Sequence, residues 1–256
     1  MIEEFRSEGG SRGGVVLVHG FTGSPEEMRP LLAPLAERSW SVLGVRLPGH
    51  GFPPTPERAE WPAWEARLDG ALDELRARFP GRRTAICGLS AGALLALRAA
   101  CRRPTDVGAL VALSPAIELP AAAKRILWLA RRLLPGPLRR LRIPKRSTDI
   151  RDAEARRRAP GCDPLPISSF LSFDELRRRA REVVATVAQP TLIVHARGDA
   201  TCPVAGAEWL RSRIGAREVE MHLLARSGHV VTVDEERDAV AGLVVDFLER
   251  RVAAAG

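Results

Sequence analysis

The pentapeptide Gly88-Leu89-Ser90-Ala91-Gly92 constrains the fold more than any other segment of the chain. A strand-like apolar run, Thr84 to Cys87, precedes it, and a helix-like run, Ala93 to Cys101, follows it. A glycine two residues away from Ser90 on either side removes side chains that would collide where a strand turns tightly into a helix. The pattern therefore predicts a strand, a strained turn that presents the Ser90 hydroxyl, and a helix.

Short apolar runs alternate with amphipathic stretches along most of the sequence. Strands are predicted at residues 15–19, 41–47, 84–87, 107–113, 191–195 and 218–224. Helices are predicted at residues 24–38, 61–79, 93–101, 173–187, 203–214 and 235–251. This alternation is typical of an α/β fold in which a mostly parallel sheet carries helices on both faces.

The alternation is interrupted between Pro115 and about Pro166 by a proline- and arginine-rich stretch with a strongly apolar helix candidate at residues 126–129. We interpret this stretch as a small helical cap inserted into one α/β core. The predicted division is residues 1–114 for the first part of the core, 115–167 for the cap and 168–256 for the second part. An insertion at this point extends beyond the carboxyl ends of the strands, where open α/β sheets bind ligands.

The net charge of +8 is concentrated in the cap. Residues 124–158 contain thirteen Lys or Arg and three acidic residues, a local net charge of +10, so the remaining chain carries −2. A basic segment could bind nucleic acid, but only one aromatic residue, Trp128, stands among its arginines. Tyrosine is absent from the chain, and no recognised binding motif is present. No nucleic-acid partner is expected.

The composition is that of a globular protein, with 45% hydrophobic and 27% charged residues. The N-terminus lacks a signal-peptide pattern, and no uninterrupted apolar stretch approaches the roughly 18 residues of a membrane span. A cytoplasmic location is therefore predicted. Four widely spaced cysteines without a C-x-x-C pair favour free thiols over a disulfide or zinc framework.

A serine nucleophile needs a base, and five histidines are available. His229 lies in a loop just after the last predicted strand, from which it can reach across the top of the sheet. His195 and His222 lie inside apolar strands and are interpreted as structural. His19 ends a predicted strand and precedes Gly20, and His50 lies in the turn Pro48-Gly49-His50-Gly51. The loop position favours His229.

The acid that orients the base is expected between the serine and the histidine along the chain. Asp199 stands in the turn directly after the strand at residues 191–195, which makes it the best candidate. Its alternative role is a turn residue or a cap for the helix that follows. Asp234 is the rival acid, interpreted as the N-cap of the last helix.

Two backbone amides are expected to bind the oxyanion. One is the amide of Ala91, directly after the serine, and the other is that of Phe21 in the loop after the first central strand. Gly20 allows the backbone of that loop to approach the site. The alternative is a strand-to-helix turn without a catalytic role.

Five segments, in this order along the chain, resemble the α/β-hydrolase superfamily. They are His19-Gly20-Phe21-Thr22-Gly23-Ser24-Pro25, Leu47-Pro48-Gly49-His50-Gly51, Gly88-Leu89-Ser90-Ala91-Gly92, Ala196-Arg197-Gly198-Asp199 and Ser227-Gly228-His229-Val230-Val231-Thr232-Val233-Asp234. The chain is most similar in pattern to small-cap bacterial carboxylesterases and monoacylglycerol lipases. The resemblance implies an α/β-hydrolase fold and a Ser90–His229–Asp199 triad with the Phe21 and Ala91 amides as oxyanion donors. Ala93 stands where relatives often carry a second glycine, and the cap sequence matches none of them.

The expected function is hydrolysis of short- to medium-chain acyl esters or monoacylglycerols through an acyl-enzyme, without a metal or organic cofactor. An acyltransferase or thioesterase with the same triad is the alternative, and a non-catalytic basic protein that binds nucleic acid or anionic membrane is a distant one. The cap residues Trp128 and Arg131-Arg132 suit weak contact with an anionic membrane surface, a lid over an acyl chain, or a helix packed on the core. The oligomeric state is left open.

Overall fold

The computed structural model describes residues 3–7, 9–51, 59–143, 148–159 and 164–251. Among these residues the central sheet has the strand order β1-β3-β2-β4-β5-β8-β9. Its strands are β1 (Phe5–Ser7), β2 (Gly13–Val18), β3 (Trp40–Val45), β4 (Thr84–Leu89), β5 (Val107–Leu113), β8 (Thr191–Ala196) and β9 (Val219–Leu224). Neighbouring strands run parallel except β1, which pairs antiparallel with β3. The predicted, mostly parallel sheet is confirmed.

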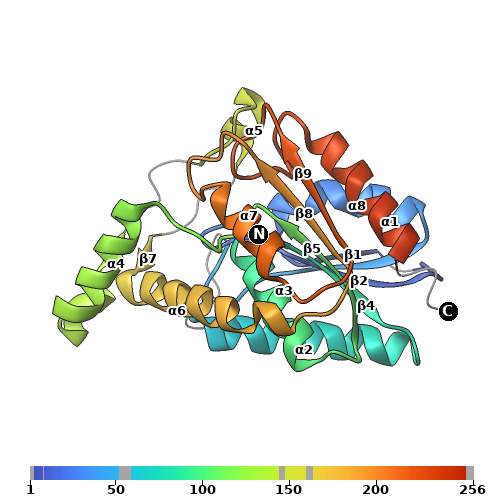
Figure 1. The fold of residues 1–256 in the computed structure, drawn as a ribbon, viewed down its shortest axis with the longest axis horizontal. Helices are drawn as coiled ribbons and strands as arrows, with labels where there is room; N and C mark the ends of the chain where they lie inside the picture. The colour runs from blue at the N-terminus through green and yellow to red at the C-terminus, as the bar shows by residue number, and fades with distance from the viewer. Residues whose placement is uncertain (1–2, 8, 52–58, 144–147, 160–163, 252–256) are drawn as a thin grey trace.

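Helices cover both faces of the sheet (Figure 1). One face carries α2 (Trp61–Arg78), α3 (Ala91–Arg102), α6 (Ile167–Val183) and α7 (Ala205–Arg213), and the other carries α1 (Leu32–Glu37) and α8 (Arg237–Arg251). Alternate residues of β2 point to opposite sides. Val16 and Val18 join the core with α2 and α3, whereas Val15 and Leu17 join the core with α1 and α8. Burial on both faces explains why this strand is apolar throughout.

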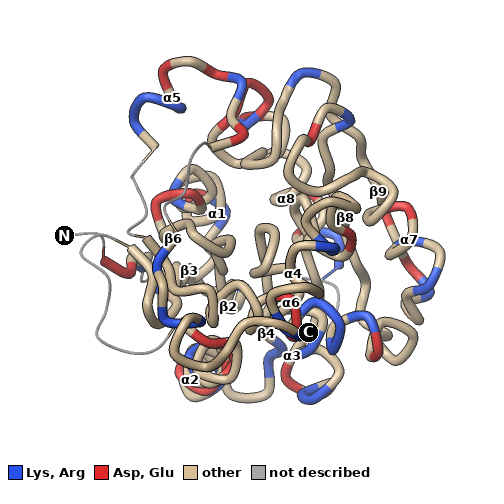
Figure 2. Tube along the Cα trace, turned by 90° about the vertical axis from the view of Figure 1, so that its left-hand side faces the viewer, with Lys and Arg blue, Asp and Glu red and all other residues tan. Residues whose placement is uncertain are grey.

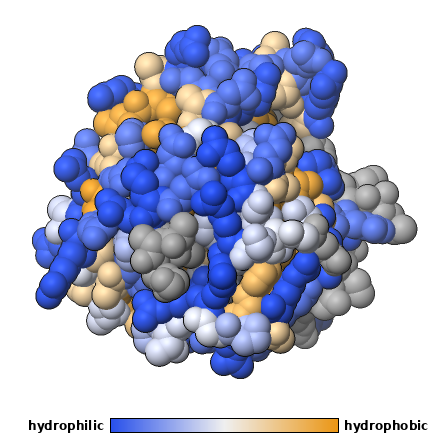
Figure 3. Space-filling view, turned by 90° about the vertical axis from the view of Figure 1, so that its right-hand side faces the viewer, coloured by the Kyte–Doolittle hydropathy of each residue, from blue (hydrophilic) through white to orange (hydrophobic). Residues whose placement is uncertain are grey.

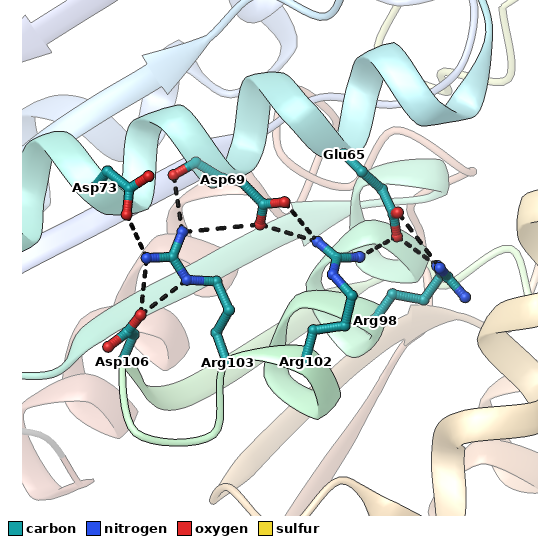
Figure 4. Close-up of polar contacts among 7 residues, drawn as sticks. All are labelled: Glu65, Asp69, Asp73, Arg98, Arg102, Arg103 and Asp106. Carbon is teal, nitrogen blue, oxygen red and sulfur yellow. Dashed lines mark hydrogen bonds and ion pairs between the residues drawn. The ribbon is translucent and has the colours of Figure 1, made fainter.

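Helices α2 and α3 are also joined by ion pairs at their outer side (Figure 4). Arg102 binds both Asp69, at 2.9 Å, and Glu65 of α2, and Arg103 binds Asp73 of α2 and Asp106, the latter at 2.8 Å. Several of these groups are partly exposed, so each pair contributes at most about 1 kcal/mol. Together they fix the orientation of α3, the helix that begins directly after Ser90.

The helix predicted at residues 24–38 is wrong in its extent. The structure has two 3-10 turns, Pro25–Glu27 and Arg29–Leu31, before the six-residue helix α1. Pro30 has no amide hydrogen to donate, and its ring disfavours the helical conformation at the preceding residue. The prolines therefore divide this stretch. The other predicted core strands and helices are present, with ends shifted by up to six residues; the largest shift is at the start of α6.

The predicted cap contains α4 (Ala121–Leu133), a 3-10 turn at Gly136–Arg140 and α5 (Ala153–Arg158). A small antiparallel pair joins β6 (Arg142–Ile143) to β7 (Leu165–Pro166). Helix α4 contacts α6 at the left of Figure 1, away from the central sheet. The division of the chain at residues 115 and 167 stays a prediction.

None of the helices formed by the described residues combines the length and apolar character that crossing a bilayer requires. The cytoplasmic location stays a prediction. Cys87, Cys101 and Cys202 are free, while Cys162 lies outside the described residues.

Candidate active site

Ser90 stands between β4 and α3 in a strained backbone conformation. Its φ is +56° and its ψ is −111°, a region that residues with a side chain rarely adopt. A Cβ added at Gly88 would lie 2.3 Å from the Gly92 backbone, and one added at Gly92 would lie 2.2 Å from the Val18 carbonyl oxygen. Both glycines are therefore needed for the tight turn that the sequence predicts.

His229 and Asp199 meet at the carboxyl ends of the strands. The distance from His229 Nδ1 to Asp199 Oδ2 is 2.7 Å. The amides of Thr201 and Cys202 donate to the other carboxylate oxygen, each at 2.8 Å, and hold Asp199 in place. When neutral His229 donates from Nδ1, its Nε2 carries the lone pair that a base needs.

The Asp199 carboxylate is stabilised in its charged form. Burial alone would raise the pKa of this carboxyl, but hydrogen bonds from His195 and His229 outweigh burial and lower the pKa well below its usual range. Asp199 therefore remains an anion that accepts from imidazole at any pH at which esters are commonly assayed.

His195 is a second, fully buried partner of Asp199. Its Nε2 lies 3.2 Å from the oxygen that His229 contacts and 3.0 Å from the Cys202 carbonyl oxygen. Its position in β8 agrees with the interpretation as a strand histidine, but its contact with the acid is not expected from the sequence. The four-residue spacing to Asp199 is the one signal that could have suggested it.

The loop after β2 brings backbone close to Ser90. A Cβ added at Gly20 would lie 3.3 Å from the Ser90 Cβ. Within the part of the chain that the structure describes, the amides of Phe21 and Ala91 donate no hydrogen bond, so both are available to a ligand. The Phe21 ring stacks on Phe173 at 5.0 Å and meets Phe170 edge-on at 5.0 Å, which fixes the backbone that carries its amide.

His19 supports this loop as a neutral side chain. Its Nε2 accepts from the Leu47 amide at 3.1 Å, and its Nδ1 lies 2.8 Å from the Gly20 carbonyl oxygen. Complete burial, aided by the nearby His50, lowers the pKa of His19 to about 3. His50 lies in the turn after β3, with its ring edge-on to Phe21, and His222 is partly buried in β9.

Asp234, the rival acid, is fully buried and its carboxylate accepts from backbone amides. The donors are Arg151 at 2.9 Å, Asp152 at 2.7 Å and Gly228 at 2.6 Å, together with the adjacent Glu235. Because α8 begins at Arg237, Asp234 is not the N-cap that the sequence suggests. It joins the cap to the loop that carries His229.

Asp149 of the cap contacts the same loop and is not found from the sequence. Its carbonyl oxygen accepts from the amides of His229 at 2.9 Å and Val230 at 3.3 Å. Its carboxylate accepts from the amide of Ala200 at 2.7 Å, next to Asp199. One cap residue thus contacts both loops that carry the candidate base and acid.

Ser90 and His229 line a common pocket of about 560 Å³. Its wall is mostly apolar and comes from the core and from the cap, including Phe21, Leu119, Leu127 and Phe170. A volume of this size accommodates a small organic ligand. The five predicted site residues are therefore brought to one place, while their catalytic roles stay predictions.

Similarity to known proteins identifies the family of the chain. A family model described as serine aminopeptidase, S33, matches residues 9–236. The chain belongs to this α/β-hydrolase family. The α/β-hydrolase fold predicted from the sequence is confirmed by solved structures as well as by the family.

Relatives in the family are esterases and lipases. A thermostable monoacylglycerol lipase of a Bacillus species is 28% identical over 97% of this chain and 94% of its own. A carboxylesterase of Bacillus subtilis is 27% identical over 96% of both chains. A solved structure from work on two metagenome-derived lipolytic enzymes, LipS and LipT, has a TM-score of 0.87 and 26% identity over 98% of both chains. The protein is a serine hydrolase of the carboxylesterase or monoacylglycerol lipase type.

Proposed function

We propose that the enzyme hydrolyses short- to medium-chain acyl esters or monoacylglycerols with Ser90 as nucleophile, His229 as base and Asp199 as the acid that orients His229. The observation that carries this proposal is the 2.7 Å contact between His229 Nδ1 and Asp199 Oδ2 beside a pocket that also contains Ser90. The contact sets the imidazole tautomer that can accept the serine proton.

The proposed reaction proceeds in two halves. Ser90 Oγ attacks the ester carbonyl carbon while its proton passes to His229 Nε2, and the oxyanion accepts hydrogen bonds from the Phe21 and Ala91 amides. His229 then gives that proton to the leaving alcohol oxygen, which leaves an acyl-enzyme. Water attacks the acyl carbon with its proton passing to His229, and collapse to the acid returns the proton to Ser90. Asp199 stabilises the imidazolium in both halves.

The lining of the pocket favours binding of an acyl chain. Leu119, Leu127 and Phe170 give it an apolar wall, and burial of each chain methylene contributes about 0.8 kcal/mol. The polar residues that line the pocket include Ser90 and His229, where the ester would react. This distribution favours an ester with one acyl chain over a highly charged substrate.

The test is a series of p-nitrophenyl esters of increasing acyl length, with 1-monoacylglycerol beside it. Ser90→Ala is expected to reduce turnover by about four orders of magnitude or more. Ser114→Ala is the matched control, because Ser114 follows the neighbouring strand β5, is buried, has φ +42° and forms no side-chain hydrogen bond with the described residues. Activity that survives in Ser90→Ala contradicts the proposal. Product analysis with an added alcohol separates hydrolysis from acyl transfer.

A further inference from the structure

The large hydrophobic side chains that the described part of the chain exposes all lie between residues 126 and 143. We call these seven residues the cap patch: Ile126, Trp128, Leu129, Leu133, Leu138, Leu141 and Ile143. Trp128 is 58% exposed and Leu133 is 67% exposed. The opposite side of the molecule is mostly hydrophilic, with scattered apolar groups (Figure 3). Apolar surface gathered in one place is typical of an interaction site.

Helix α4 orders its exposed residues in two neighbouring stripes. Ile126, Leu129 and Leu133 recur at spacings of three and four, so they share one stripe of the helix. Arg125 and Arg132 are seven residues apart and share the stripe beside it. The inner side of the helix, which includes Leu127, packs against the core. The outer side of α4 is therefore amphipathic.

The cap patch is surrounded by positive charge, most of which forms no ion pair with the residues that the structure describes. Residues 121–143 contain seven Lys or Arg and neither Asp nor Glu. Lys124 pairs with Glu118, and Arg131 pairs with Asp174. The other five form no ion pair with any described residue: Arg125, Arg132, Arg139, Arg140 and Arg142. Figure 2 looks onto the side of the molecule where α4 lies, and basic segments are visible there.

The cap patch reaches the pocket of the candidate active site. Ile126 and Ile143 belong to the patch and also line the pocket that contains Ser90, and Leu127 lines it from the same helix. A continuous apolar surface therefore leads from the outside of the cap to the pocket.

We propose that the cap patch docks the enzyme on an anionic lipid surface. The apolar stripe of α4 enters the boundary between head groups and acyl chains. Arg125, Arg132 and Arg140, which form neither an ion pair nor a side-chain hydrogen bond with the described residues, bind the phosphates of the head groups. The apolar stripe favours lipid over nucleic acid, because a nucleic acid would leave Ile126, Leu129 and Leu133 in water. Docking itself does not need the proposed function; its consequence, delivery of an acyl ester into the pocket, rests on that function.

Binding is tested without catalysis by vesicle co-sedimentation of the Ser90→Ala protein. Vesicles of equal parts phosphatidylglycerol and phosphatidylcholine are expected to retain the protein, and vesicles of phosphatidylcholine alone are not. Raising the salt concentration is expected to release it, because screening weakens the arginine contacts. Equal binding to both vesicle types, or to neither, overturns the proposal.

Two double variants in the Ser90→Ala background locate the surface. Trp128→Ser with Leu133→Ser, and Arg132→Gln with Arg140→Gln, are each expected to weaken binding at least about tenfold. Arg211→Gln with Arg213→Gln removes the same charge from exposed positions of α7 and is expected to change binding little. Equal weakening by the α7 control overturns the assignment to the cap. If the protein binds a DNA duplex and the Trp128 and Leu133 substitutions do not weaken that binding, the basic residues bind nucleic acid instead. If the protein is a dimer that both patch variants dissociate, the patch binds a second copy of the chain.

An activity measurement separates docking from chemistry. With Ser90 present, Trp128→Ser with Leu133→Ser is expected to leave hydrolysis of p-nitrophenyl acetate in solution near the parent rate. Its hydrolysis of monoacylglycerol embedded in the anionic vesicles is expected to fall at least about tenfold. An equal loss on both substrates would show a defect in folding or in the site. Failure of the parent protein on both substrates would contradict the proposed function while the sedimentation result stands.

Discussion

Asp199 accepts from two histidines through one carboxylate oxygen, and the two histidines differ in what they can do. His229 lines the pocket beside Ser90, whereas His195 is fully buried and bound to the Cys202 carbonyl oxygen. His195 therefore acts as a positioning residue for the carboxylate, and His229 is the imidazole that can exchange protons with a substrate. The negative charge of Asp199 strengthens the contacts with both histidines.

Replacement of Asp199 by Asn removes that charge. An amide in this position can present its NH₂ group to His229 Nδ1, which places the imidazole proton on the wrong nitrogen. We expect turnover of p-nitrophenyl esters to fall about 10⁴-fold. Unfolding curves of the variant and the parent provide the control for folding. A loss of less than about tenfold in a folded variant would mean that another group orients His229.

The residues that follow strands are predictable because parallel strands end at one edge of the sheet. Ser90, Asp199 and His229 each follow a strand, and their order along the chain adds a second constraint. The roles of Asp149 and His195 are not predictable in this way. The contacts of Asp149 depend on loops that bring residues distant in the sequence together, and no local pattern encodes the paths of those loops. His195 is only four residues from Asp199, but this spacing alone does not tell that the turn after β8 folds the carboxylate back onto the imidazole.

At the scale of elements, a short segment of the cap is joined to the loop that carries His229. The Asp234 carboxylate accepts from amides of Arg151 and Asp152 in the cap and of Gly228 in the loop. The carbonyl oxygen of Asp149, also in the cap, accepts a hydrogen bond from the amide of His229 itself. Movement of the cap segment would therefore displace the candidate base.

Asp234→Ala tests this connection. The substitution leaves four backbone amides without their acceptor, at about 1–3 kcal/mol for each one that is buried. We expect a clear fall in the unfolding temperature, and lower esterase activity in the fraction that remains folded. Asp152→Ala is the nearby comparison, because it removes the N-cap of α5 and should cost only about 1 kcal/mol. Similar stability of the two variants would argue against a joining role for Asp234.

At the scale of the whole molecule, two apolar cores on opposite faces of one sheet hold the strand ends in place. His19 directly follows β2 and accepts from the amide of Leu47, which lies beyond the end of β3. It thereby joins the carboxyl ends of these two strands beside the loop that carries Phe21. It remains uncharged in the folded protein because burial lowers its pKa to about 3.

The low pKa of His19 predicts a dependence of stability on pH. Below about pH 6.5 the unfolded chain binds a proton at this residue that the folded protein does not, so stability falls as the pH is lowered. Between pH 6.5 and 5 the loss is about 2 kcal/mol. Asp and Glu residues whose charged form is stabilised by folding change the free energy of unfolding mainly at lower pH, where these residues become protonated in the unfolded chain. Denaturant unfolding across the window should show a smaller slope in His19→Gln than in the parent, whatever its absolute stability; equal slopes would contradict the assignment.

The fold as a whole is predictable from alternating periodicity, since buried parallel strands and amphipathic helices leave different patterns in the sequence. Two parts are not. The stretch at residues 24–38 breaks into turns because Pro30 interrupts its hydrogen bonds. The outer surface of α4 stays exposed, although the same apolar pattern would equally suit burial.

A covalent label tests the central claim that Ser90 is the activated nucleophile. A fluorophosphonate ester reacts when a serine oxygen attacks phosphorus, fluoride leaves and the hydroxyl proton passes to the base. Mass spectrometry of the digested protein is expected to find one phosphonate on the peptide that contains Ser90, no label in Ser90→Ala, and much slower labelling in Asp199→Asn. Labelling of another residue at the parent rate, or no labelling of a protein that hydrolyses esters, would contradict the account.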